Sequence, residues 1–287
     1  MIRVNLSLIH PRLLSTLVLM DPIIQEASRG PSKTRRPAHA ILSTFRRDLW
    51  PSREVASASF GNSKFYQNWD DRVLKKWIEF GLRDLPTAIY PNASRSQDET
   101  TAVTLMTPKH QEVFTYGRPN YRAQGGSGKQ TINRTTHADL DPADPSTYPC
   151  YRPEKLITFR NLPFLRPSVL YIFGGESESS PPEWRKTKLE RTGTGVGGSG
   201  GAQAGRVKEV VLEGIGHLVA MEAVEACADA AAMWFDQELK RWRKEEEDFN
   251  REWSKKKKQE KFMLDEEWMK RIGAKSGRSN SRTSNKL

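Results

Sequence analysis

The chain has 287 residues, of which 36% are hydrophobic, enough for one large domain or two modest ones. Its formal net charge is +11, and 16 basic residues against 9 acidic ones follow position 239, so the excess lies mainly in a tail. No apolar run approaches the roughly 18 residues that span a membrane. The two cysteines, Cys150 and Cys227, form neither a disulfide framework nor a metal-binding pattern, and they favour a reducing compartment. We therefore expect no transmembrane segment, no metal and no cofactor.

The first predicted elements are a helix end and a buried strand. Residues 1–10 read as the end of a helix that stops at Pro11. Residues 15–22 (STLVLMDP) form a continuous apolar run between turn signals, which is typical of a strand buried on both faces of a parallel sheet. Residues 168–175 (SVLYIFGG) and 207–214 (VKEVVLEG) repeat this pattern. A helical stripe follows the third run, with apolar residues at Val224, Cys227, Ala231, Trp234, Phe235, Leu239 and Trp242, which makes Cys227 a buried thiol.

The region between the first two predicted strands has a different character. Helical patterns occur around residues 38–49 and 70–83, separated by loops rich in Pro, Asn and Ser, and no further strand and helix alternate. This predicts an inserted, mostly helical module. Residues 191–205 contain many glycines and predict a mobile connection, not a phosphate-binding loop, because they lack a G-K-[ST] ending and precede their strand.

His217 is the first candidate for chemistry. It ends the sequence Gly214-Ile215-Gly216-His217, which follows the third predicted strand and precedes a helix. The glycines let the backbone turn sharply and leave the imidazole free to approach a nucleophile. Taken alone, the motif favours a loop histidine bonded to a backbone carbonyl. The other histidines show no metal-ligand spacing.

The second candidates are the carboxylates of Gly174-Gly175-Glu176-Ser177-Glu178, which follow the second predicted strand. A carboxylate at this position would hold His217 in one tautomer and stabilise its cation. The alternative is an exposed acidic loop. The combined order, with a strand and carboxylate followed by a helix, strand and histidine, is that of the acid and base in α/β-hydrolases.

These stretches resemble α/β-hydrolases, and among them the fungal peroxisomal group that includes a peroxisomal lipase and hydrolases of toxin-biosynthesis clusters. The matching segments are NLSLIHPRLLSTLVLMDP, VLYIFGGESESSPPEW and VVLEGIGHLVAMEAVE, within residues 4–242. The resemblance implies a partial α/β-hydrolase fold and hydrolysis of a small-molecule ester or acyl substrate, as in an esterase or lipase. It makes His217 the general base and Glu178 the acid, with Glu176 as the second choice, although the family more often has aspartate.

The same resemblance divides the chain into four parts. Residues 1–30 would be a fragment of the hydrolase core, 31–165 a helical lid that includes Lys109–Tyr121, 166–244 the core with acid and base, and 245–287 a basic, partly disordered tail. The nucleophile elbow G-x-S-x-G should precede the first helix, and the sequence before residue 10 contains no such pattern. We therefore expect an N-terminally truncated family member without nucleophile or oxyanion hole, inactive as written.

Two other functions remain open at this stage. One is a non-catalytic binding remnant, or pseudoenzyme. The other is a basic tail that binds anionic surfaces, against which the acidic clusters at 245–248 and 265–267 argue, and we expect no specific nucleic-acid partner.

The last residues predict a cellular address. Peroxisomal import reads a terminal S-K-L or a relative of it. Lys286 and Leu287 match this signal, and Asn285 replaces the small residue. The prediction is capture by the peroxisomal import receptor and a place in the peroxisomal matrix, with the cytoplasm as the alternative.

Overall fold

A computed structural model describes residues 2–10, 12–26, 38–91, 101–121, 133–140 and 150–272. The chain divides into two compact units, residues 1–236 and 237–287. The predicted targeting residues Asn285, Lys286 and Leu287 lie outside the described residues.

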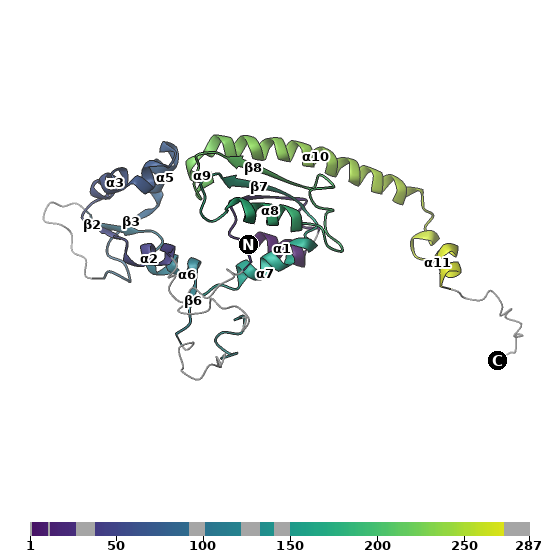
Figure 1. The fold of residues 1–287 in the computed structure, drawn as a ribbon, viewed down its shortest axis with the longest axis horizontal. Coiled ribbons are helices and arrows are strands. Elements are labelled where there is room, and N and C mark those ends of the chain that lie inside the picture. The colour runs from purple at the N-terminus through teal and green to yellow at the C-terminus, as the bar shows by residue number, and fades with distance from the viewer. Residues whose placement is uncertain are drawn as a thin grey trace, which may run out of the picture. The chain divides into compact units, whose positions relative to one another are not determined.

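The first unit contains a three-stranded parallel sheet in the order β1-β7-β8. Its strands are β1 (Thr16–Met20), β7 (Ser168–Gly174) and β8 (Val207–Leu212), so the three predicted strands are confirmed with slightly shorter ends. Every residue of β7 is buried, because this central strand is covered on both faces. The result is an α/β fold with a parallel sheet and flanking helices (Figure 1).

Alternate residues of β7 build two cores. Tyr171 and Phe173 face a layer formed by α1 (Ile2–Ile9) and α7 (Glu154–Asn161). Ile172 faces the opposite way, onto the first part of α10 (Val224–Lys255) and the short helix α9 (Val219–Glu222). In Figure 1, α1, α7 and α8 (Pro182–Arg191) lie on one side of the strands and the first part of α10, up to residue 236, on the other. Cys227 is buried in the second core, as the helical stripe predicts.

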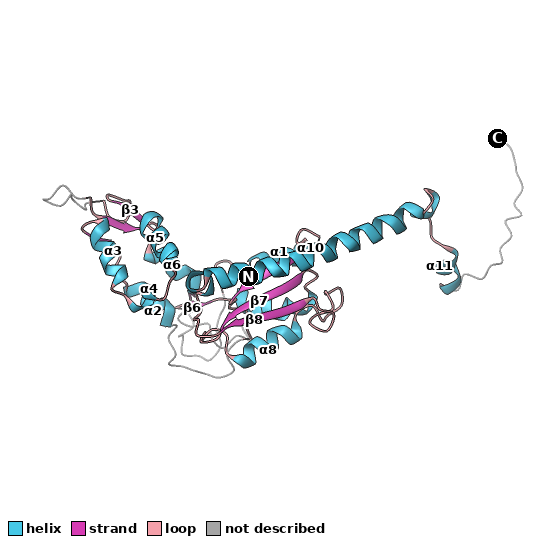
Figure 2. Cartoon of the chain, turned by 90° about the horizontal axis from the view of Figure 1, so that it is seen from above, coloured by secondary structure: helices cyan, strands magenta, loops and turns pink. Residues whose placement is uncertain are grey.

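The region between β1 and β7 combines helices with short strands. Its helices are α2 (Ala38–Phe45), α3 (Arg53–Gly61), α4 (Lys64–Gln67), α5 (Asp71–Phe80) and α6 (Lys109–Tyr116). A small antiparallel sheet in the order β2-β4-β3 is formed by Leu49–Trp50, Val103–Leu105 and Leu82–Asp84. A further pair joins β5 (Arg118–Pro119) to β6 (Cys150–Tyr151), and a 3-10 turn, η2 (Leu162–Phe164), follows α7. Figure 2 shows β3 beside helices α3 and α5.

These short strands are not predicted by the sequence. Each is two or three residues long, too short for an alternating pattern to be recognised. They become visible only through their partners, because Trp50, Leu82 and Val103 meet in one buried aromatic and aliphatic cluster.

The glycine-rich segment 191–205 is not a loose connection, so the expectation of a mobile linker is wrong. Gly193 N donates to Leu162 O at 2.9 Å, and Ser199 N donates to Leu165 O at 2.8 Å. A Cβ on Gly198 would stand 2.5 Å from the carbonyl oxygens of Gly193 and Pro163. Glycine is needed there because two backbone segments pack too closely for a side chain.

The second unit begins within α10 and continues through η3 (Gln259–Lys261) to α11 (Glu266–Arg271). Helix α11 starts at Asp265, whose carboxylate accepts a hydrogen bond from Trp268 N at 2.7 Å. In the part of the chain that the structure describes, no helix is both long enough and apolar enough to cross a bilayer.

Candidate active site

The candidate site lies where the three parallel strands end. Asp21 directly follows β1, and its backbone N donates to Ile172 O of β7 at 2.7 Å, so the hydrogen-bond ladder continues one residue past the strand. Asp21 has a φ of 38°, which is uncommon for a residue with a side chain. Because parallel strands point the same way, the residues that follow β1, β7 and β8 meet at one edge of the sheet.

Asp21 and His217 form a partly buried pair at this edge. Nδ1 of His217 lies 2.6 Å from Oδ2 of Asp21, a short, charge-assisted contact across 196 positions of sequence. The Asp21 side chain is 0% exposed, whereas that of His217 is 33% exposed. The Nε2 atom of His217 has no hydrogen-bond partner within the described ranges. The ring is thus held through one nitrogen, and its other nitrogen is available for proton transfer.

Serine hydroxyls keep the Asp21 carboxylate ionised. Ser177, after β7, donates from Oγ to Asp21 Oδ2 at 2.5 Å. Burial by itself raises the pKa of Asp21, but hydrogen bonds from His217, Ser177 and Ser180 outweigh it, so the pKa lies below the usual value of 3.8. An ionised carboxylate is the state that fixes the tautomer of a catalytic histidine.

The loop that carries His217 is fixed by Glu222. The Glu222 carboxylate accepts from Gly216 N at 2.9 Å and from Leu218 N at 3.3 Å, on both sides of the histidine. The loop also rests on Gly174, the last residue of β7, where an added Cβ would lie 2.0 Å from Gly216 O. Only glycine at that position permits this approach, which explains why the β7 strand ends in glycine.

The structure corrects the expectation about the acid. Glu178 and Glu176 are both exposed, and neither contacts His217 among the described residues; the carboxylate beside the imidazole is that of Asp21. The physical reason is the turn after β7, where Ser177 N donates to Gly174 O at 3.2 Å and the Ser177 side chain is buried. Its two neighbours then face solvent, so the exposed acidic loop was the correct alternative.

The sequence contained a signal for Asp21. It stands at the end of the first apolar run, where Asp21-Pro22 is also a turn signal that ends a strand. All carboxyl ends of parallel strands share one edge, so a carboxylate after any of the three strands was a candidate partner for His217.

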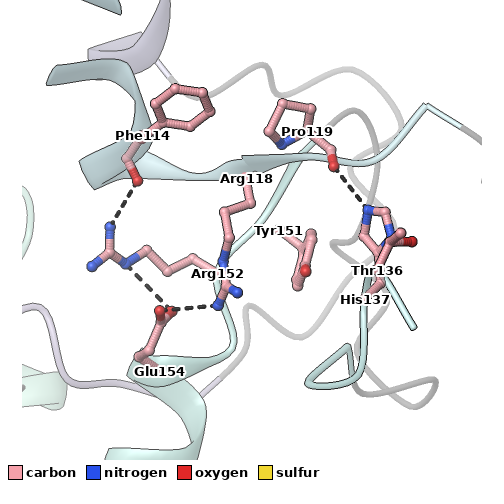
Figure 3. Close-up of a pocket in the computed structure, with 8 residues that line it drawn as sticks. All are labelled: Phe114, Arg118, Pro119, Thr136, His137, Tyr151, Arg152 and Glu154. Atoms are coloured by element: carbon pink, nitrogen blue, oxygen red, sulfur yellow. Dashed lines mark hydrogen bonds and ion pairs between the residues drawn. The ribbon is translucent and has the colours of Figure 1, made fainter. Parts of the chain in front are cut away.

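A separate cavity of about 480 Å³ lies in the inserted region (Figure 3). Arg118 contacts Glu154 at 3.0 Å there and also pairs with Asp139, while Arg152 lies 3.6 Å from Glu154. Burial lowers the pKa of Arg118, but Asp139 and Glu154 outweigh this and raise it above its ordinary value. The two arginines of the lining are thus paired with Glu154 and, outside the lining, with Asp139. Its lining residues are Phe114, Arg118, Pro119, Thr136, His137, Tyr151, Arg152 and Glu154, without Asp21 or His217.

No metal site accompanies these features in the described part of the chain, where no three His, Cys, Asp or Glu side chains could hold an ion together. Parallel strands with a carboxylate and a histidine paired at their carboxyl ends define the class of α/β-hydrolase-type proteins.

Comparison with known proteins agrees with this class. No family model matches the chain. The type I acyl-CoA thioesterase mpaH of Penicillium roqueforti (strain FM164) is 38% identical over 277 residues, covering 93% of this chain and 62% of the relative. The abhydrolase domain-containing protein AKT2 of Alternaria alternata is 28% identical over 235 residues, covering 82% of this chain and 78% of the relative. The chain thus spans about three fifths of the length of the thioesterase that it matches.

A solved structure shows the same fold. The peroxisomal alpha-beta-hydrolase Lpx1 of Saccharomyces cerevisiae superposes with a TM-score of 0.51 at 16% identity, over 83% of this chain and 51% of that one. The chain belongs to the α/β-hydrolase superfamily.

Proposed function

We propose that Asp21 and His217 are the acid and base of an acyl hydrolase of the serine type. The observation that carries this is the 2.6 Å contact between Nδ1 of His217, whose side chain is partly exposed, and the fully buried carboxylate of Asp21. In this role Nε2 takes the proton of a nucleophile that attacks the substrate carbonyl, and returns it to the leaving group. The one G-x-S-x-G match, at residues 197–201, lies between α8 and β8 and not at a turn from a strand into a helix, so the nucleophile is not assigned.

The proposed substrate class is a small-molecule acyl thioester or carboxylic ester. The printed names of the relatives support it, since mpaH is called an acyl-CoA thioesterase and AKT2 an abhydrolase domain-containing protein. Both bonds present the same carbonyl carbon to a nucleophile, and the same base protonates a leaving thiol or alcohol.

We further propose that the inserted region, residues 31–165, serves as a lid. Its aromatic cluster packs against Leu218, the residue after His217. Asp70 N also donates to Met221 O at 2.8 Å, and Arg72 lies 3.3 Å from Glu225. These contacts join the inserted region to the segment that follows His217. A movement of the inserted region would therefore also displace this segment.

The test uses the protein made from the longest transcript that encodes residues 1–287. Hydrolysis of a medium-chain acyl-CoA thioester and of the matching p-nitrophenyl ester is measured for the natural sequence, for His217→Ala and for His10→Ala. His10 is an exposed histidine and serves as the control. We expect His217→Ala to reduce kcat/KM on both substrates by at least about a thousandfold, because it removes the base.

The outcomes separate the alternatives. If the natural sequence hydrolyses neither substrate and reacts with no fluorophosphonate probe, the non-catalytic remnant is the better account. If it hydrolyses them and His217→Ala is as active as His10→Ala, the assignment of the base fails. The preferred leaving group, thiol or alcohol, follows from the ratio of the two kcat/KM values.

Peroxisomal import remains a proposal that rests on Asn285, Lys286 and Leu287. An N-terminal fluorescent fusion in a fungal cell should colocalise with a peroxisomal marker, and removal of these three residues should disperse it. A diffuse signal for the intact sequence would favour the cytoplasm.

A further inference from the structure

A buried lysine lies behind the acid of the candidate site. Lys188, in α8, is 0% exposed, although lysine is almost never fully buried without a partner. Its Nζ donates to Pro22 O at 2.9 Å and to Ser180 Oγ at 3.3 Å, and it lies 5.2 Å from the centre of the Phe173 ring. Burying an ammonium group is costly, so these contacts must compensate for the water it has lost.

Both acceptors belong to the segments that hold Asp21. Pro22 is the next residue after Asp21, and Ser180 closes the turn after β7, where its backbone N donates to Ser177 O at 3.1 Å and Ser177 in turn donates to the Asp21 carboxylate. One ammonium group therefore ties the turn after β1 to the turn after β7. Asp21 needs such support, because its φ of 38° is a conformation that persists only where the surroundings fix it.

We propose that Lys188 is a positioning residue that keeps Asp21 aligned with His217, an inference that rests on the proposed function of that pair. It touches neither a reacting atom nor the imidazole. It acts through Pro22 and Ser180, which fix the backbone next to Asp21 and the turn that carries Ser177, and through its positive charge, which favours the ionised form of Asp21.

The charges around Lys188 fit this role. Burial lowers the pKa of its ammonium to about 8, the Asp21 charge raises it, and Arg185 on the same helix lowers it further. Ser180 and Ser177, both buried, connect Lys188 to Asp21, because Lys188 donates to Ser180 Oγ, Ser180 N donates to Ser177 O and Ser177 Oγ donates to Asp21 Oδ2. Asp21 thus contacts the imidazole directly and the buried cation through this turn.

The test reads the geometry of the pair and not its activity. In the 287-residue chain, the proton shared by His217 Nδ1 and Asp21 Oδ2 gives a far-downfield NMR resonance when the imidazole is protonated, and its exchange with water reports how firmly the pair is aligned. The variant is Lys188→Met, which keeps the apolar stem and removes the charge. The matched control is Lys186→Met on the same helix, where the side chain is 76% exposed.

We expect the natural sequence and Lys186→Met to give the same resonance. Lys188→Met should lose it, or exchange at least tenfold faster, while circular dichroism shows a folded chain. If Lys188→Met does not fold, Lys188→Gln, which keeps a donor without the charge, should exchange at least threefold faster. An unchanged resonance and exchange rate in the folded variant would overturn the proposal.

This experiment is independent of hydrolysis. If the resonance is lost in Lys188→Met but the natural sequence hydrolyses no acyl substrate, the positioning role stands and the proposed function fails. If hydrolysis depends on His217 but the resonance is unchanged in Lys188→Met, the positioning role fails alone.

Discussion

Two groups of charged side chains in the first unit use similar residues in different surroundings. At the edge of the parallel sheet, Asp21 is 0% exposed and pairs with His217. In the cavity of the inserted region, Arg118 is 40% exposed and its partners Asp139 and Glu154 are 40% and 39% exposed. Asp21 is excluded from water, whereas the cavity charges remain partly solvated.

The difference shows that burial, not the kind of charge, distinguishes the two groups. Partly solvated ion pairs contribute about 0–1 kcal/mol, because water screens them and long side chains lose freedom. A buried carboxylate that loses its partner is instead left with an uncompensated charge, at a cost of about 3–5 kcal/mol. The strand ends should therefore be sensitive to single substitutions that the cavity tolerates.

The largest effect is expected for Asp21→Asn. The amide keeps the shape of the side chain but cannot stabilise the imidazolium or hold the same tautomer of His217, so hydrolysis by the protein that contains residues 1–287 should fall about 10⁴-fold in kcat. Steady-state kinetics with the acyl thioester measure it. Glu178→Gln is the control, because Glu178 is exposed and should change the rate less than about twofold. Equal losses in both variants would return the acid role to Glu178.

Gly174→Ala should be the next most damaging change. Its Cβ would lie 2.0 Å from Gly216 O, so the strand or the His217 loop must shift, at a cost of about 1–3 kcal/mol in the free energy of unfolding. Urea denaturation measures it. Gly61→Ala is the control, since a Cβ there meets nothing within 4 Å. If both alanines are tolerated equally, the loop is not held against β7 as described.

Lys188 predicts a pH dependence of stability. Its pKa is lowered by burial from 10.5 to about 8, so between about pH 8 and 10.5 the unfolded chain binds the proton more tightly than the folded one. The free energy of unfolding should thus gain on the order of 2 kcal/mol from pH 7 to pH 10 through this residue. Urea denaturation at several pH values between 7 and 10 gives the free energy of unfolding of the natural sequence and of Lys188→Met. The difference between these two free energies isolates the contribution of Lys188. If both proteins show the same change with pH, the prediction is contradicted.

Arg118→Met should have the smallest effect. It breaks the pairs with Asp139 and Glu154, but all three side chains remain partly solvated, so the loss in the free energy of unfolding should be below about 1 kcal/mol. The same urea measurements provide the value. A loss as large as that of Gly174→Ala would show that the cavity charges are as critical to the fold as the strand ends.

The sequence predicted the elements that have strong local signals. The three apolar runs became β1, β7 and β8, and the stripe through Cys227 and Trp234 became the buried side of α10. His217 was found because glycines and a preceding strand mark its loop. The strands of the inserted region were missed because two or three residues carry no period, and residues 191–205 were misjudged because glycine marks close packing as well as flexibility.

What the sequence determined by itself is the class of fold and the position of His217 after the third strand, since both depend on patterns within a few neighbouring residues. Only the tertiary structure decided which carboxylate faces His217. Asp21 and Glu178 both follow strands, but the turn after β7 buries Ser177 and exposes Glu178, while the continued ladder after β1 places Asp21 against the imidazole. That choice depends on contacts between segments 196 positions apart, and no local pattern contains them.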